Sequence, residues 1–287
     1  MQGTVDGFSY GLVTPVVAYL MACLGGALGL RCTTRAQLVG GSWRPGWLAL
    51  GSAAIGSGIW TMHFVAMMGF TIDQAPIHYD KPTTYASLGV AIVMVGVGIF
   101  MVGYRGATGT ALFTGGTITG LGIASMHYLG MAGMRFDGRL EYNTLTVAAS
   151  VAIGVAAATA ALWAAGKVRG FLWSVGASLV MGLAVSGMHY TGMAALSVHL
   201  HAATPGEGDS PAALLAPMMI GPLAFLCLAA AVVIFDPLAV TGRLPRPAAE
   251  HGLGVPAHPV AHRPARRTPM RPGRDLDRRR PRAPQNR

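Results

Sequence analysis

Residues 182–193 read Gly182-Leu-Ala-Val-Ser-Gly-Met188-His189-Tyr190-Thr191-Gly192-Met193. Two earlier stretches align with this one without gaps: Gly56-Ser-Gly-Ile-Trp-Thr-Met62-His63-Phe64-Val65-Ala66-Met67 and Gly120-Leu-Gly-Ile-Ala-Ser-Met126-His127-Tyr128-Leu129-Gly130-Met131. Each contains a Met-His pair and a second Met four residues after the His. The histidines are 64 and 62 residues apart (127 − 63 and 189 − 127). A motif that recurs at a nearly constant interval indicates a repeated structural unit.

The chain around these motifs has the composition of a membrane protein. Of its 287 residues, 52% are hydrophobic and 11% are charged, whereas soluble domains carry about 25% charged residues. A membrane-spanning helix needs about 20 mostly apolar residues. Seven such stretches occur, at about 10–30, 46–70, 83–103, 110–132, 144–165, 172–196 and 214–235. We therefore predict an all-α polytopic membrane domain of seven transmembrane helices over residues 8–236, packed closely through its many glycines.

The basic residues are distributed unevenly and predict the topology. From Asp236 onward the chain has twelve Arg and four acidic residues. Most Lys and Arg of the loops fall on the same side as this tail, which predicts an outer N-terminus and a cytoplasmic C-terminus in the plasma membrane. The Pro- and Arg-rich segment 237–287 is expected to be disordered and to touch anionic lipid head groups of the bilayer. It lacks interleaved aromatic residues, so we expect no specific nucleic acid partner.

Several other classes of function have no support in the sequence. Cys23, Cys32 and Cys227 show no CxxC spacing, so a disulfide framework or a zinc site is not expected. The first apolar stretch lacks a basic leader and a cleavage site, and we interpret it as a retained helix. No phosphate-binding loop, nucleophile elbow or intramembrane carboxylate is found. We predict that the protein is not an enzyme.

The three motifs are expected to share one depth and one face. They fall on the second, fourth and sixth helices, which run in the same direction, near the outer face. Residues four apart lie one helical turn above one another. The same face carries Ile59, Ile123 and Val185 one turn further in. Two turns further in it carries a belt of Gly56, Gly120 and Gly182, at which the three motif helices are expected to cross closely.

Imidazole and thioether groups together favour a soft metal. This ligand set suits copper, especially Cu(I), and is poor for magnesium, calcium or manganese. Ionisable side chains inside a membrane are costly and therefore point to function, although packing alone is the alternative. The predicted metal ligands are His63, Met67, His127, Met131, His189 and Met193, together with Met62, Met126 and Met188. The loop residues His78, His199 and His201 are further candidates that would cap a metal at the outer mouth.

These motifs resemble the MHYT family of bacterial integral membrane sensor domains. The tetrapeptide that names the family is present at Met188-His189-Tyr190-Thr191, while the other two copies read Met-His-Phe-Val and Met-His-Tyr-Leu. The resemblance covers about residues 8–236. It implies seven helices with the motifs near the outer face, and a proposed role in binding copper and sensing O2, CO or NO. Members are often fused to cyclic di-GMP enzymes or kinases, and the short tail here implies a separate signalling partner.

Three functional hypotheses follow. The first is a copper-dependent sensor of a diatomic gas or of redox state. The second is copper transport or handling, which would need polar groups along the whole path. The third is haem ligation by His and Met in an electron carrier. An absorption spectrum and a metal analysis would distinguish them.

Overall fold

The computed structural model describes residues 5–7, 9–39, 41–72, 75–167, 170–201 and 209–236, all within one compact unit, Met1–Arg243. The predicted disordered tail, 237–287, lies outside the described residues. Within them, seven α-helices form most of the structure, and a short 3-10 helix η1 (Gly41–Trp43) leads into the second. The helices are α1 (Val13–Val39), α2 (Arg44–Met68), α3 (Lys81–Arg105), α4 (Gly109–Ala132), α5 (Thr144–Lys167), α6 (Phe171–Ala194) and α7 (Pro211–Ile234).

Six of these helices are long and apolar enough to cross a membrane by length and composition, so the chain is a multi-pass membrane protein. The helix outside this set is α4, because glycine and threonine occupy many of its positions. The prediction of seven spans is therefore confirmed for six helices, and for α4 it stays a prediction.

Local signals explain where several helices begin and end. The Asp80 carboxylate accepts a hydrogen bond from the Thr83 amide at 2.9 Å and caps α3, and hydroxyls of Thr108 and Ser210 cap α4 and α7. Such caps satisfy amides that have no partner within the helix. The helix that differs most from its predicted bounds is α1, which continues to Val39 instead of ending near residue 30. Its last turns are polar but still helical, because hydrophobicity and helical conformation are separate properties.

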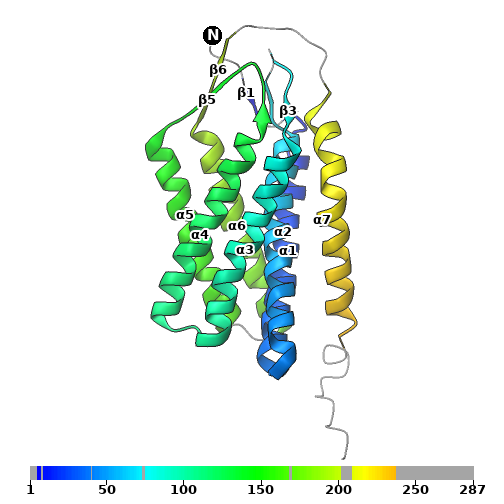
Figure 1. The fold of residues 1–287 in the computed structure, drawn as a ribbon, viewed down its shortest axis with the longest axis vertical. Coiled ribbons are helices and arrows are strands. Elements are labelled where there is room, and N and C mark those ends of the chain that lie inside the picture. The colour runs from blue at the N-terminus through cyan, green and yellow to red at the C-terminus, as the bar shows by residue number, and fades with distance from the viewer. Residues whose placement is uncertain are drawn as a thin grey trace, which may run out of the picture. The chain divides into compact units, whose positions relative to one another are not determined.

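The first six helices form a closed ring. Consecutive helices pack side by side from α1 to α6, and α6 packs back against α1. The seventh helix lies outside this ring, mainly against α2 (Figure 1). The motif helices α2, α4 and α6 therefore alternate with α1, α3 and α5 around the ring. Three helix pairs, each with one motif helix, thus create an approximate threefold arrangement.

Short strands close each pair of helices at one end. The described part of the chain contains three antiparallel ribbons, in which β1 (Val5–Asp6) pairs with β2 (Thr71–Ile72), β3 (His78–Tyr79) with β4 (Met134–Arg135), and β5 (Gly138–Tyr142) with β6 (Leu196–Leu200). In each ribbon one strand precedes an odd-numbered helix and its partner follows the next even-numbered helix. The repeat is therefore strand–helix–helix–strand. These strands were not predicted from the sequence, because they are short and pair residues far apart in the chain.

The glycine belt makes different contacts from those predicted. A Cβ atom on Gly56 would lie 2.8 Å from the Ile92 Cα of α3, and one on Gly120 would lie 2.4 Å from the Val155 Cα of α5. A Cβ atom on Gly182 would lie 2.5 Å from the Cys23 sulfur of α1. The expectation that the three motif helices cross one another at this belt is wrong. Each glycine instead allows its helix to approach the odd-numbered neighbour, because the ring alternates the two kinds of helix.

A hydrogen bond from α3 satisfies a backbone carbonyl that a proline leaves unpaired in α7. Pro222 has no amide hydrogen, so the carbonyl of Met218, four residues earlier, has no intrahelical donor. The Tyr85 hydroxyl donates to this carbonyl at 3.3 Å. We expect Tyr85→Phe to reduce the stability of the folded protein by about 1 kcal/mol, because a partly buried carbonyl loses its donor. Thermal unfolding in detergent measures this change.

Tyr104→Phe is the matched control, because Tyr104 lies on the same helix and is about as exposed as Tyr85, but its hydroxyl makes no hydrogen bond to α7 among the described residues. Its aromatic ring, which Arg44 contacts, is retained in the phenylalanine variant. Equal losses of stability in the two variants would contradict this role of Tyr85.

Candidate metal centre

Each motif histidine occupies the same place on its helix. His63, His127 and His189 lie five residues before the last residue of α2, α4 and α6 (68 − 63, 132 − 127 and 194 − 189). Because these helices are parallel, the imidazoles lie at one depth, near the end of the bundle that carries the ribbons; this end is called the histidine end below. Each histidine is 1% exposed. The alternating ring directs all three toward its interior.

The three imidazoles meet through the same nitrogen atom. Nδ1 of His63 lies 3.1 Å from Nδ1 of His127 and 3.1 Å from Nδ1 of His189, and the third distance is 3.3 Å. The rings are nearly perpendicular to one another, with interplanar angles of 78° to 90° and centroids 4.9 to 5.1 Å apart. The three Nδ1 atoms thus form a nearly equilateral triangle inside the bundle, and these three histidines are a group able to hold a metal ion.

The size of this triangle fits a metal ion. Metal–imidazole bonds of about 2.0–2.1 Å in tetrahedral geometry place two nitrogens about 3.3–3.4 Å apart. The observed separations are close to this value, and three ligands leave one coordination position open, as in catalytic metal sites. The imidazole nitrogens suit copper, zinc, iron or nickel.

The hydrogen bonding of the Nε2 atoms is also relevant to whether the three histidines bind a cation. Nε2 of His63 and Nε2 of His127 are buried without a hydrogen-bond partner. A neutral imidazole carries one N–H and one lone pair. If the hydrogens are on Nε2, three Nδ1 lone pairs point at one another, and a shared cation would stabilise that arrangement. If they are on Nδ1, three N–H groups point at one another instead. In either case the two buried Nε2 atoms lack a partner, which is unfavourable.

The predicted methionine ligands divide into two groups. Met67 and Met193 line a cavity of about 330 Å³ beside His189, together with Ala66, Phe70 and Tyr190 among others. The other four, Met62, Met126, Met131 and Met188, do not line this cavity and are each at most 1% exposed, although Met67 is equally buried at 1%. Met188 packs against Gly154 of α5. The two groups therefore differ in whether they border the cavity, and Met67 and Met193 are the two that do.

Two glycines near the histidines were missed by the sequence analysis. A Cβ atom on Gly130 would lie 2.7 Å from His63 Nε2, and one on Gly192 would lie 2.6 Å from His127 Nε2. Each glycine thus makes room for the imidazole of the preceding repeat. The equivalent residue in the first motif is Ala66, which lines the cavity beside His189. The available signal was a small residue just before the second Met of every motif.

Aromatic rings surround the histidines. Phe64, Tyr128 and Tyr190 each pack edge-on against the histidine that precedes them, with centroids 4.6 to 4.9 Å apart. Tyr79 of β3 and Tyr142 of β5 pack on Phe64 and Tyr128 from the ribbon side. Burial raises the pKa of Tyr142 to about 12 and also raises the pKa of Tyr79. These two phenols remain neutral and bring no charge to the site.

The loop histidines lie apart from this centre. His78 is exposed on β3. His199 Nδ1 lies 3.6 Å from a carboxylate oxygen of Glu141, and His201 Nδ1 lies 3.5 Å from one of Asp137. His199 and His201 therefore face acidic groups of the β5–β6 region, and the structure does not bring them together with the three motif histidines.

Sequence comparisons agree with the repeated architecture. The family profile described as "MHYT: Bacterial signalling protein N terminal repeat" matches residues 56–115 and 120–178. This chain belongs to the MHYT family. The two matched segments contain the first and second motifs, and the third MHYT motif, with His189, follows directly after them.

Three MHYT relatives illustrate the family. The bifunctional diguanylate cyclase/cyclic di-GMP phosphodiesterase MucR of Pseudomonas aeruginosa is 35% identical over 79% of this chain and 34% of its own length. The cyclic di-GMP phosphodiesterase NbdA of the same organism is 36% identical over 72% of this chain and 28% of its length. The signaling protein YkoW of Bacillus subtilis is 32% identical over 69% and 26%. This chain therefore spans about a third or less of these relatives. No solved structure matches it.

Proposed function

We propose that this MHYT protein is a membrane sensor that binds copper through His63, His127 and His189. The observation that carries the proposal is the triangle of three buried Nδ1 atoms, 3.1 to 3.3 Å apart, contributed by three separate helices. Buried polar groups of this kind are costly unless they are paired or bind a ligand. A structural role alone would not require all three nitrogens to meet at one point.

The choice of copper rests on the donor atoms. Imidazole alone fits several metals, but the thioethers of Met67 and Met193 beside His189 favour a soft ion such as Cu(I). Bound copper supplies an open coordination position and one-electron redox chemistry, both suited to O2, CO or NO. The protein's own contribution is a rigid triangle of nitrogens in an apolar surrounding that excludes competing ligands.

One side of the centre is more open than the others. The Nε2 edges of His63 and His127 lie against Gly130 and Gly192, where no space remains. His189 instead lines the cavity of about 330 Å³. We place the entry of metal and gas at this cavity, because it is the side on which Met67 and Met193 are also found.

Membrane orientation follows from the two ends of the bundle. Basic residues and exposed tryptophans gather at the end opposite the histidines, namely Arg31, Arg35, Arg44, Trp43, Arg105, Trp163, Lys167 and Trp173. Tryptophan favours the membrane–water interface and basic residues favour the cytoplasmic side. In this proposal all seven helices cross the plasma membrane, the histidine end faces outward, and residue 237 onward is cytoplasmic.

The output is proposed to involve a partner that contacts α7 or the basic end. Helix α7 packs mainly on α2, which carries His63. Between them, Phe64 packs on Trp60 at 4.6 Å, Trp60 stacks on Tyr85 at 6.4 Å, and Tyr85 bonds to α7. A shift of α2 on ligand binding would therefore reach α7 through contacting side chains. Cyclic di-GMP enzymes named among the relatives suggest the class of partner.

The other two hypotheses have weaker support. A haem needs room for its porphyrin between two axial ligands, whereas Nδ1 atoms 3.1 to 3.3 Å apart leave none. A copper transporter needs polar groups along a path, but Ile59, Ile123 and Val185 are buried one turn below the histidines. Both points favour a sensor that holds its metal in place.

Metal analysis and spectroscopy of the purified protein test the proposal. We expect about one copper ion per chain after loading, a spectrum without a haem Soret band, and a spectral change when CO or NO is added to the reduced protein. Failure to retain copper after loading would contradict the metal site. Retained copper without any response to gas or to a change of redox state would contradict the sensing role.

A further inference from the structure

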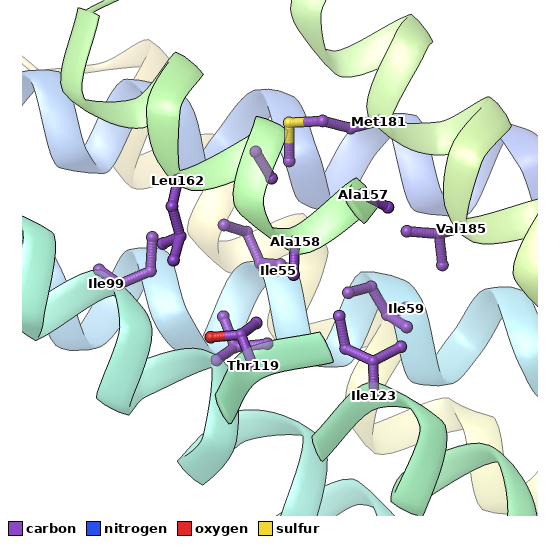
Figure 2. A pocket seen from close by; sticks show the side chains of 12 residues that line it. Ile55, Ile59, Ile99, Thr119, Ile123, Ala157, Ala158, Leu162, Met181 and Val185 are labelled. Carbon is purple, nitrogen blue, oxygen red and sulfur yellow. The ribbon is translucent and has the colours of Figure 1, made fainter. Parts of the chain in front are cut away.

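A second, smaller cavity lies inside the helix ring, one turn below the histidines. Figure 2 shows side chains from several helices pointing into this common space. Its wall includes Ile59, Ile123 and Val185, each four residues before a histidine of the centre. Four residues correspond to about one helical turn, or about 6 Å along the axis. The cavity is therefore adjacent to the proposed metal centre and separate from the cavity beside His189.

The lining is apolar on every side. Eleven of the twelve lining residues are apolar, and the exception is Thr119. Its hydroxyl donates a hydrogen bond to the Met94 carbonyl at 3.2 Å, so this O–H group is not free to donate to a molecule in the cavity. A buried water needs about two to four polar partners, which this wall does not offer. The cavity is therefore suited to an apolar occupant rather than to water.

The size limits that occupant to a very small molecule. The cavity has a volume of about 30 Å³, and a single water needs about 10–15 Å³ on the same measure. Two bonded atoms of the second period fit, whereas an organic ligand does not. O2 is apolar and CO and NO are nearly so, and all three dissolve in the lipid around the helices and require no hydrogen bond.

We propose that this cavity is a docking site for a diatomic gas molecule directly beneath the three-histidine centre. The proposal rests on the proposed gas-sensing function and assigns a second place to the same ligand. A molecule held here remains within about one helical turn of the Nδ1 triangle. The protein thereby raises the local concentration of gas at the metal without any polar contact.

Xenon binding to the metal-free protein tests the cavity directly, because xenon is an apolar probe that occupies small dry cavities. The protein is labelled at isoleucine δ1 methyl groups and its NMR spectrum is recorded under increasing xenon pressure. We expect saturable shifts for the methyls of Ile55, Ile59, Ile99 and Ile123, which line the cavity. Ile77 is buried in the loop before β3, at the histidine end, and does not line the cavity. Its methyl is the reference and should show no saturable shift.

Replacement of alanines on α5 by valine supplies both the cavity-filling variants and their control. Ala158 is 2% exposed and lines the cavity, whereas Ala156 lies on the same helix and is exposed. Ala158→Val should abolish the xenon-dependent shifts, and Ala156→Val should retain them. Ala161→Val, at a half-buried lining position, serves as a second filling variant if Ala158→Val does not fold. Absence of saturable shifts in the wild type, or their persistence in both filling variants, would overturn the proposal.

Gas delivery is tested separately on the copper-loaded, reduced protein. After flash photolysis of bound CO, a fraction of the CO should rebind from within the protein, and this fraction should fall in Ala158→Val but not in Ala156→Val. An unchanged fraction would overturn the docking role even if xenon binds. If the copper-loaded protein binds no CO at all, the sensing function fails, while the xenon result still decides whether the cavity admits apolar gas.

Discussion

Replacement of His63, His127 or His189 by alanine, one at a time, is expected to lower copper affinity by more than about 100-fold. Each change removes one of three nitrogens that meet at 3.1 to 3.3 Å. Loss of a group that only orients a metal ligand costs about 10–100-fold, so loss of a ligand itself should cost more. Competition with a chelator of known affinity measures the effect on purified protein.

His78→Ala is the control for this series, because His78 is exposed on β3 and outside the cluster. Its copper affinity should equal that of the wild type. Thermal unfolding of each variant without metal shows whether the bundle remains folded, and His→Gln variants preserve more of the side-chain volume. Wild-type affinity in any folded variant at His63, His127 or His189 would rule out a centre that uses all three nitrogens.

Gly192→Ala is expected to weaken copper binding by about 10–100-fold although residue 192 supplies no ligand. The added methyl group would lie 2.6 Å from His127 Nε2 and 3.1 Å from its Cδ2. The imidazole must therefore shift, and its Nδ1 atom then leaves the triangle. Gly130→Ala should act in the same way on His63, since its Cβ atom would lie 2.7 Å from that residue's Nε2.

Gly187→Ala provides the matched control on the same helix, because a Cβ atom there meets nothing within 4 Å. Alanine is favoured over glycine in a helix by about 1 kcal/mol, so this variant should be at least as stable as the wild type and bind copper equally well. A variant that combines His127→Ala with Gly192→Ala should bind copper as tightly as His127→Ala alone. Equal copper affinities of Gly187→Ala and Gly192→Ala would show that the close contact does not position His127.

The sequence alone predicted most of the helical framework. Hydropathy is a local property, so the seven helices were found to within a few residues, apart from the polar end of α1 after Leu30. The end of α1 was missed because hydropathy locates the apolar part of a helix and not the polar turns that continue beyond it. The interval between motifs also indicated that His63, His127 and His189 share a depth, since equal repeats place equivalent residues at equivalent heights.

The sequence could not determine which helices surround each motif. The belt of Gly56, Gly120 and Gly182 was expected to join the motif helices, but each glycine meets an odd-numbered helix instead. The partners Ile92, Val155 and Cys23 carry no pattern that marks them as neighbours. Only the alternating ring, which depends on how complete helices pack, decides these contacts.

Hydropathy and the triple Met-His motif together therefore determined the seven helices, the common direction of the three motif helices and the common depth of the three imidazoles, because all of these follow from composition and from a spacing along one chain. The tertiary structure decided that the Nδ1 atoms meet, that Gly130 and Gly192 make room for the rings, and that Met67 and Met193 border a cavity. These features depend on atoms about 60 or more residues apart being within a few ångströms. No local pattern encodes such distances, so they become visible only when the ring of helices is closed.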